Sequence, residues 1–339
     1  MALSSDELVK REISDFIGHG DSGLKLRIFP QSSREDQELF SAGGLTFGVN
    51  QVSYGSCDAA WYSEEAWIDP FNNSIGKSKP LIAVEATDAL NRGSSGNAQY
   101  QRFHHALGAV KAGCIGVYYF RPGKDKIQED LFAMAYRASQ LELGTYIVTD
   151  SINKLKKLVN LTGNPSALEK ELSQLLEDME DRFQSKFRLK YNSDWHKFAS
   201  DRSTLLIDGM VIKHAGRMSR NFTDSSQRAG HIAVGEMYLT KYFFPNKPII
   251  YLFAKMLKSE RESLDQRKTF DKEWHLLRNE PDVSIATLDD IVGISRNTKK
   301  RLIAIKDDPL KGTALQIYKK CMQEIVFGLQ SKTMTIALN

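Results

Sequence analysis

The sequence predicts an α/β fold, in which a mixed central sheet is flanked by helices and is followed by a mostly helical C-terminal region. Two observations predict the sheet. Strand-like and helix-like stretches alternate from residue 80 to residue 161, and an earlier strand-like run leads into the first of them through a long polar turn. A third observation predicts the helical region, because long charged stretches with apolar residues at helical spacing predominate later in the chain.

The composition is that of an ordinary globular protein, since 41% of the 339 residues are hydrophobic and 26% are charged. A net charge of +4 permits nucleic acid as a partner without requiring it. Three widely separated cysteines indicate reduced thiols, and no apolar run reaches the roughly 20 residues that span a bilayer. The first residues do not resemble a secretory signal. We therefore expect a cytoplasmic protein that does not associate with membranes.

The first part of the chain predicts one helix and several short strands. The helix begins at a capping sequence, Ser4–Glu7, and ends near Gly18 or Gly20. Short runs rich in β-branched and aromatic residues predict strands at 24–30, 45–49 and 52–54.

A hairpin with a long polar tip is predicted around residues 58–87. Its first strand contains Asp58, its tip at 69–79 is rich in proline, asparagine and glycine, and its second strand is Pro80–Thr87. The second strand contains Glu85 among apolar and small residues. Because a buried carboxylate is costly unless it meets a metal ion, a proton or a base, Glu85 indicates a functional site on this strand.

The elements after the hairpin alternate between helix and strand. Such alternation predicts right-handed crossovers and a site at the ends of strands. The predicted elements are helices at 97–113, 127–141 and 151–161, and strands at 114–120 and 144–150.

A turn sequence, Gly163–Ser166, predicts a boundary between two regions, residues 1–162 and residues 163–339. A charged helix at 167–187 then carries leucines at heptad-like spacing, and it either packs on the core or forms a dimer contact. No internal repeat is visible. The later predicted elements are a hairpin at 205–212 with its turn at Asp208–Gly209, a helix at 232–244, a strand at 248–254 and a helix at 258–277.

Glu85 needs a second carboxylate to hold a divalent cation, and two residues are candidates. Neighbouring residues on paired strands lie about 4.5–5.5 Å apart at Cβ, so a hairpin can direct two acids at one Mg²⁺ ion. Asp58 lies on the first strand, whereas Asp69 lies among turn residues, where capping the turn is an alternative role. We favour Asp58 and keep Asp69 as the alternative.

The order of elements from residue 45 to residue 160 resembles the PD-(D/E)XK nuclease superfamily, to which many type II restriction endonucleases belong. The residues that carry the resemblance are Asp58 or Asp69 on one side of the hairpin and Glu85-Ala86-Thr87 on the other. The resemblance implies a restriction-endonuclease-like catalytic core in residues 1–162, with DNA recognition and dimer contacts in residues 163–339. It also implies Mg²⁺-dependent, site-specific hydrolysis of double-stranded DNA by a homodimer, in which each subunit cuts one strand.

The chain departs from the family at Thr87, which stands where the family has lysine. In the family that lysine orients or activates the attacking water and stabilises the charge that develops on the phosphate. Thr87 can hold a water molecule but supplies no positive charge. A residue of the following helix would then take over, and the candidates are Gln99, Gln101, Arg102 and His105.

Three groups of residues are candidate DNA contacts. Ser94, Ser95 and Asn97 lie at a predicted helix start, with Asn97 as its N-cap, where they would bind a phosphate oxygen or only cap the helix. A polar loop at 217–228 is equipped to read bases, or is an ordinary exposed loop; its candidates are Arg217, Arg220, Asn221, Gln227 and Arg228. Residues 287–303 resemble a helix-turn-helix or, alternatively, a helix-hairpin-helix, or they form an ordinary basic helix pair. In its basic cluster, which also contains Arg301, the candidate DNA contacts are Arg296, Asn297, Lys299 and Lys300.

The sequence leaves two other functions open. The missing lysine favours a sequence-specific DNA-binding protein with an inactive nuclease-like core. The other alternative is an unrelated α/β enzyme that acts on a nucleotide, with Ser94-Ser95-Gly96 around a phosphate. The chain contains neither of the common glycine-rich phosphate-binding fingerprints, so we place this alternative last.

Overall fold

The chain divides into two compact units, residues 1–188 and 189–339. The boundary comes later than the one predicted after residue 162, because the next helix packs within the first unit. The computed structural model describes residues 5–29, 45–49, 52–63, 79–88, 90, 95–124, 127–184, 204–214, 228–266, 272–308 and 311–338.

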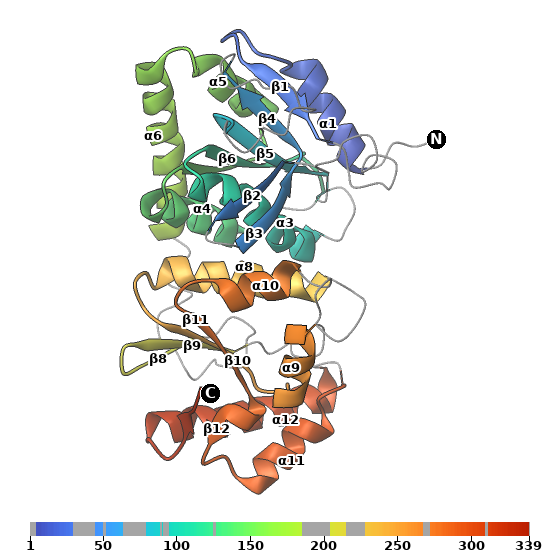
Figure 1. The fold of residues 1–339 in the computed structure, drawn as a ribbon, viewed down its shortest axis with the longest axis vertical. Helices are drawn as coiled ribbons and strands as arrows, with labels where there is room; N and C mark the ends of the chain where they lie inside the picture. Colours follow the sequence, from blue (N-terminus) through green and yellow to red (C-terminus); the bar gives the residue numbers. More distant parts are fainter. Residues whose placement is uncertain are drawn as a thin grey trace. The chain divides into compact units, whose positions relative to one another are not determined.

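A five-stranded mixed sheet forms the centre of the first unit, with its strands in the order β1-β4-β5-β6-β7 (Figure 1). β4 pairs antiparallel with β1 and β5, whereas β5, β6 and β7 run parallel to one another. The mixed α/β sheet predicted from the sequence is therefore confirmed. The strands are β1 Lys25–Ile28, β4 Ala59–Tyr62, β5 Ile82–Thr87, β6 Ile115–Phe120 and β7 Thr145–Thr149.

Helices and a small second sheet surround these strands. α3 and α4 contact each other and the central sheet, and so do α1 and α5. The small sheet is the antiparallel pair β2–β3, which packs on α3. The elements are α1 Ser5–Phe16, α3 Ser95–Lys111, α4 Glu129–Leu141, α5 Ile152–Leu161, α6 Pro165–Arg182, β2 Leu45–Val49 and β3 Val52–Cys57.

Helix α6 shows how the sequence sets the start of an element. The Asn164 side chain accepts a hydrogen bond from the Ala167 N–H at 3.2 Å, and Pro165 occupies the first turn, where its missing N–H costs nothing. Leu175 and Met179 are buried, and α6 packs on α4 and α5. Of the two roles that the sequence left open for this leucine-rich helix, the structure shows packing within the first unit.

The second unit contains a four-stranded sheet in the order β11-β10-β9-β8. β8 and β9 form the predicted antiparallel hairpin with its turn at Asp208–Gly209, and β9, β10 and β11 run parallel. α8 and α10 cover one face of this sheet and α12 covers the other (Figure 1). The strands are β8 Thr204–Ile207, β9 Met210–His214, β10 Ile249–Phe253, β11 Val283–Thr287, and the separate pair β12 Ile291–Val292 and β13 Thr335–Ile336. The helices are α8 Arg228–Phe243, α9 Lys258–Gln266, α10 Lys272–Asn279, α11 Arg296–Ala304 and α12 Gly312–Gln330.

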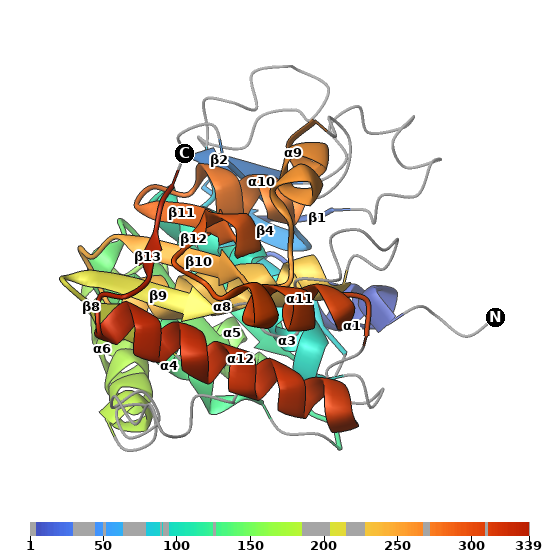
Figure 2. The ribbon, with the colours of Figure 1, turned by 90° about the horizontal axis from the view of Figure 1, so that it is seen from below.

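Helix α12 lies along the sheet of the second unit (Figure 2). Tyr318, Met322 and Ile325 recur at helical spacing on its buried face, where they join the core of this unit. Its other face carries charged residues, as expected for a helix at the surface of a globular unit. None of the helices in the described part of the chain combines the length and the apolar character that crossing a bilayer requires.

The second unit repeats the order of elements of the first. In both units an antiparallel hairpin leads through a helix to a parallel strand and through another helix to a second parallel strand. The two series are β4-β5-α3-β6-α4-β7 and β8-β9-α8-β10-α10-β11, with α9 added before α10. The spatial order of the strands also corresponds.

Residues 287–303 do not form the predicted helix-turn-helix. Their first part is the end of β11 and a single 3-10 turn, Leu288–Asp290, which β12 follows. The Asp290 carboxylate accepts hydrogen bonds from the Thr287 N–H at 2.7 Å and from the Thr287 hydroxyl at 2.8 Å. These bonds stabilise a single short turn in place of a longer helix. Only the second predicted helix exists, as α11.

Candidate active site

Asp58 and Glu85, called the acid pair below, lie opposite each other where β4 and β5 pair. Ala59 of β4 pairs with Val84 of β5, and the two strands are antiparallel. The residue before Ala59, Asp58, therefore lies opposite the residue after Val84, Glu85. The Asp58 N–H donates to the Val84 carbonyl at 2.8 Å, which continues the strand pairing to this position. Of the two candidates for the first acid, the structure places Asp58 beside Glu85, while Asp69 lies outside the described residues.

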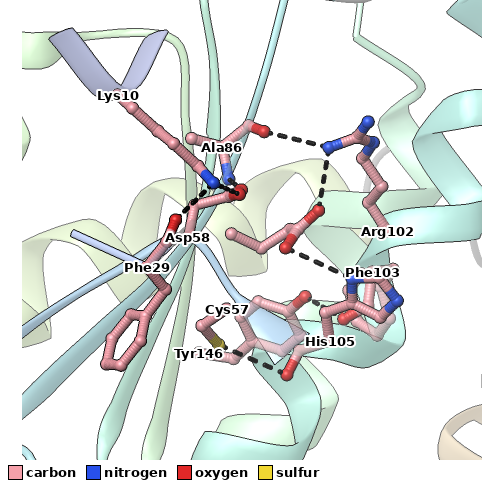
Figure 3. A network of polar contacts seen from close by, with 10 residues as sticks. Lys10, Phe29, Cys57, Asp58, Ala86, Arg102, Phe103, His105 and Tyr146 are labelled. Carbon is pink, nitrogen blue, oxygen red and sulfur yellow. Dashed lines mark hydrogen bonds and ion pairs between the residues drawn. The ribbon is translucent and has the colours of Figure 1, made fainter. Parts of the chain in front are cut away.

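Two groups from different parts of the first unit hold the Asp58 carboxylate (Figure 3). Its Oδ2 accepts a hydrogen bond from the Ala86 N–H at 2.9 Å, and its Oδ1 lies 3.2 Å from Nζ of Lys10 on α1. The Lys10 ammonium also donates to the Phe29 carbonyl at 2.5 Å. The Lys10 and Asp58 side chains are only 10% and 12% exposed, so this ion pair lies mostly out of water.

The Glu85 carboxylate faces α3 and is 2% exposed. Arg102 Nη1 lies 3.1 Å from its Oε1, and His105 Nδ1 lies 3.2 Å from its Oε2 (Figure 3). The two basic residues are three positions apart and therefore share one face of α3. Arg102 Nη1 also donates to the Ala86 carbonyl at 3.3 Å. The Arg102 guanidinium thus gives the site a positive charge from helix α3.

The electrostatics of the acid pair favour a cation. Burial, and after it the negative charge of Glu85, raises the pKa of Asp58 to about 7, although the Lys10 ammonium and the Ala86 N–H act in the opposite direction. The two carboxylates therefore repel each other even with their ion pairs in place. A divalent cation between them would remove this repulsion.

The neighbouring thiol and phenol stay protonated. Burial raises the pKa of Cys57 well above its usual range, and the negative charges of Glu85 and Asp58 raise it further. Burial also raises the pKa of Tyr118, the cross-strand partner of Glu85. A thiolate nucleophile is therefore disfavoured here, and carboxylates and basic groups are the chemistry that this site offers.

The oxygen atoms of the site fit a hard divalent cation. Asp58, Glu85 and the Ala86 carbonyl supply the kind of ligand that Mg²⁺ prefers. Arg102 Nη1 already places a positive group within 3.3 Å of both Glu85 Oε1 and the Ala86 carbonyl oxygen. Within the described part of the chain, no group of three or more histidines, cysteines, aspartates or glutamates is placed to hold a metal ion. A bound Mg²⁺ would therefore complete its ligands with water and substrate, as this ion commonly does.

The structure separates the residues that could replace the missing lysine. Arg102 and His105 lie at the acid pair. Gln99 is engaged elsewhere, because its Oε1 accepts a hydrogen bond from the Gln128 N–H at 2.7 Å. The side chain of Gln101 lies outside the described residues. Among the predicted replacements, Arg102 and His105 are therefore the two that the structure brings to the site.

Thr87 ends β5 and is buried, at 2% exposure. It shares a face of the strand with Glu85, two residues earlier. The next residue, Asp88, lies 3.6 Å from Arg121 Nη1, and Arg121 Nε lies 3.3 Å from Glu12 on α1. Charged residues from α1 and from the end of β6 therefore surround the carboxyl end of β5.

The predicted DNA contacts of the α3 start and of the polar loop are described only in part. Helix α3 begins at Ser95, two residues before Asn97, so Asn97 is not its N-cap as predicted. Ser94 lies outside the described residues, and Arg228 begins α8. The remaining loop candidates outside the described residues are Arg217, Arg220, Asn221 and Gln227.

Helix α11 carries the predicted basic cluster. Arg296, Asn297 and Lys300 are exposed, and Lys299 forms an ion pair with Asp289 at 2.7 Å. The predicted side chains are therefore accessible to a ligand although the segment is not a helix-turn-helix, and one of them, Lys299, already has an ion-pair partner.

A cavity of about 350 Å³ at the carboxyl ends of β6 and β7 is a rival site. Both basic residues of its lining contact other groups of the protein: Arg182 lies 3.4 Å from Glu129 and 3.9 Å from the centre of the Phe132 ring, and Lys154 lies 3.8 Å from Asp178. Neither member of the acid pair lines this cavity. The acid pair is therefore the better candidate for chemistry.

Lys10 is the site residue that the sequence prediction missed. It lies in a helix whose inner face carries Val9 and Ile13, and the Lys10 side chain is itself buried. Its position on the apolar side of an amphipathic helix could have identified Lys10 as a site residue, because a buried ammonium needs a partner. The sequence does not show that this partner is Asp58.

Comparison with known proteins finds no match for this chain among protein-family models, curated proteins or solved structures. The class of the protein is therefore inferred from its fold and its site.

Proposed function

We propose that this protein is a Mg²⁺-dependent endonuclease of the type II restriction class, which hydrolyses double-stranded DNA at specific sequences. The observation that supports it most strongly is the acid pair on a hairpin that leads into helix, strand, helix and strand. This is the arrangement that the PD-(D/E)XK resemblance implies. The raised pKa of Asp58 further supports a site built to receive a cation.

The reaction is hydrolysis of a phosphodiester. The oxygen of a water molecule bonds to phosphorus, one phosphorus–oxygen ester bond breaks, and a proton from the water ends on the departing oxygen. Mg²⁺ held there would polarise the phosphoryl oxygen and lower the pKa of the attacking water. Asp58 and Glu85 would hold the ion, while Arg102 and His105 orient Glu85.

The proposed partners are double-stranded DNA and a second copy of the chain. The exposed Arg296, Asn297 and Lys300 of α11 suit contacts with phosphates and base edges. A homodimer, with one cut per subunit, is the assembly that the resemblance implies. We propose a cytoplasmic location, where such an enzyme meets incoming DNA.

The test is incubation of the protein with plasmid and phage DNA in the presence of Mg²⁺. We expect discrete fragments that disappear when EDTA removes the ion. An absence of cutting across many sequences, with both Mg²⁺ and Mn²⁺, would contradict the proposal.

A second candidate function is that of a sequence-specific DNA-binding protein with an inactive nuclease-like core. Two observations favour it: Thr87 replaces the lysine of the family pattern, and both acids already pair with basic groups. This candidate predicts tight binding to a particular sequence without cleavage in any divalent metal. Cleavage by the wild-type protein would rule it out.

A further inference from the structure

We propose that Lys10 supplies, from helix α1, the positive charge that Thr87 cannot provide beside the reacting phosphate. This inference rests on the proposed nuclease function and adds a residue from outside the hairpin and the following helix. In the sequence Lys10 lies far from the acid pair, and only the folded structure brings them together.

The position of the Lys10 ammonium supports this role. Nζ lies 3.2 Å from Asp58 Oδ1, at one edge of the proposed ion site, and is fixed by the Phe29 carbonyl at 2.5 Å (Figure 3). The side chain is 10% exposed, so its charge is screened less by water than that of a surface lysine. A positive group held in this way needs little rearrangement when negative charge develops on a phosphate.

Arg102 is the rival for this role, but its contacts suit it less well. Its Nη1 lies at Glu85 Oε1 and at the Ala86 carbonyl, which are two of the oxygens that Mg²⁺ would use. A bound ion would compete with Arg102 for both. A bound ion would also compete with Lys10 for Asp58 Oδ1, but the Lys10 ammonium keeps an independent partner beside the site, the Phe29 carbonyl, which is not among the proposed ion ligands. Lys10 can therefore stay in place when an ion binds.

A purely structural role is the other rival. In that case the Lys10–Asp58 pair would serve only to anchor α1 on the sheet. An apolar residue would do this as well, because a buried ion pair commonly contributes no more stability than apolar side chains of the same size. Val9 and Ile13 already anchor the same helix with side chains that are fully buried. The placement of a lysine beside a carboxylate is better explained by function.

The experiment compares the full-length wild type with Lys10→Met, Lys10→Arg and Arg11→Met. Arg11 is the exposed neighbour of Lys10 on the same helix, so its variant also removes one positive charge from α1. Cleavage of plasmid DNA is measured with enzyme in excess over DNA and with Mg²⁺. Binding to the same DNA is measured with Ca²⁺. Each cleavage rate is divided by the fraction of protein that binds DNA, so that unfolded protein does not lower the measured rate.

For Lys10→Met we expect a cleavage rate at least about 100-fold lower with DNA binding retained, as for loss of a preorganised charge. Lys10→Arg should regain part of the rate, and Arg11→Met should stay within about twofold of wild type, since an exposed charge contributes little. Wild-type cleavage by Lys10→Met, with only its melting temperature lowered, would show that the pair is structural and would overturn the assignment. If wild type itself never cleaves, the nuclease proposal fails and the role of Lys10 fails with it.

Discussion

At the scale of single residues, the acid pair places two carboxylates in a part of the first unit that is nearly closed to water. Asp58 is 12% exposed and Glu85 is 2% exposed. Two like charges in such a place destabilise the fold, and Lys10 and Arg102 only partly offset this, as the raised pKa of Asp58 shows. Buried charged groups that lower the stability of the fold are typical of functional sites.

The first prediction concerns the pH dependence of stability in the presence of EDTA. The pKa of Asp58 is about 7 in the folded protein and 3.8 in the unfolded chain, so between these pH values the folded state holds a proton that the unfolded state has lost. The free energy of unfolding therefore falls as pH rises through this range. Relative to Asp58→Asn, the wild type should lose on the order of 4 kcal/mol from pH 4 to pH 8, at about 1.4 kcal/mol for each pKa unit.

Urea unfolding of both proteins at several pH values measures this difference, and subtraction removes the contribution of groups that the two proteins share. A difference that stays constant with pH would contradict the raised pKa of Asp58. Addition of Mg²⁺ at pH 8 should stabilise the wild type more than Asp58→Asn, because an ion that binds the folded state raises its stability.

The sequence predicted Asp58 and Glu85 because both lie in one hairpin, where strand pairing limits which residues can meet. It could not predict Lys10, because no local rule relates a residue of the first helix to a strand so far along the chain. It named Arg102 and His105 only as two of four candidates, since the choice depends on how α3 is rotated against β5. Contacts within one hairpin were thus predictable from the sequence. Contacts between a hairpin and a helix elsewhere in the chain were not.

At the scale of elements, close packing of α3 against β6 positions Arg102 and His105. Gly116 on β6 makes this approach possible. A Cβ added at Gly116 would lie 2.5 Å from Val110 Cγ2 and 2.6 Å from the Ala106 carbonyl oxygen, and the second of these is a backbone atom that cannot turn away. Any larger residue there must push α3 from the sheet.

The second prediction is that Gly116→Ala lowers the free energy of unfolding by about 1–3 kcal/mol, the usual cost of overpacking. Gly163→Ala is the matched control, because the nearest atom to its added Cβ is Ser22 Cβ at 3.8 Å. Thermal or urea unfolding measures both. Equal stability of the two variants would mean that α3 does not approach β6 as closely as described.

The sequence predicted most elements of the first unit, because their apolar residues follow the periods of strand and helix without interruption. It failed at residues 287–303, where the apolar and charged residues also fit a helix. There Thr287 completes a parallel strand, and hydrogen bonds to Asp290 fix a short turn. Tertiary pairing with β10 overrides the local helical pattern.

At the scale of the whole molecule, the second unit repeats the topology of the first with an inverted charge. In the first unit Glu85 is the cross-strand partner of Tyr118 and pairs with a base on the next helix. In the second unit Lys213 is the cross-strand partner of Tyr251, and its Nζ lies 3.7 Å from Glu236 on the next helix. A lysine repels the cation that a glutamate would bind, so the second unit should not hold a metal ion at this position.

The third prediction follows from that inversion. Lys213→Met leaves the Glu236 carboxylate buried without its lysine, so it should lower stability by about 3–5 kcal/mol. Adding Glu236→Gln should restore part of the loss. Cleavage by the folded variant should equal that of wild type. A loss of cleavage with stability intact would instead place catalytic chemistry in the second unit.

The repeat was not predictable from the sequence. It lies in the order and direction of strands, and residues at corresponding positions differ even in charge, as Glu85 and Lys213 do. The charged stretches of the second half predicted a mostly helical region, and helices do form most of its regular structure, but they also predicted a helix-turn-helix, which was wrong. The structure shows a sheet with helices on both faces and no such motif within the described residues.

The most direct test of the proposed function is DNA cleavage by Glu85→Ala beside Glu142→Ala. Both glutamates pair with a basic residue of α3, Glu85 with Arg102 and Glu142 with Lys111, but only Glu85 belongs to the acid pair. We predict that Glu85→Ala binds DNA with Ca²⁺ and does not cleave it with Mg²⁺, whereas Glu142→Ala cleaves like the wild type. Wild-type cleavage by a folded Glu85→Ala variant would contradict the assignment of the acid pair as the catalytic site.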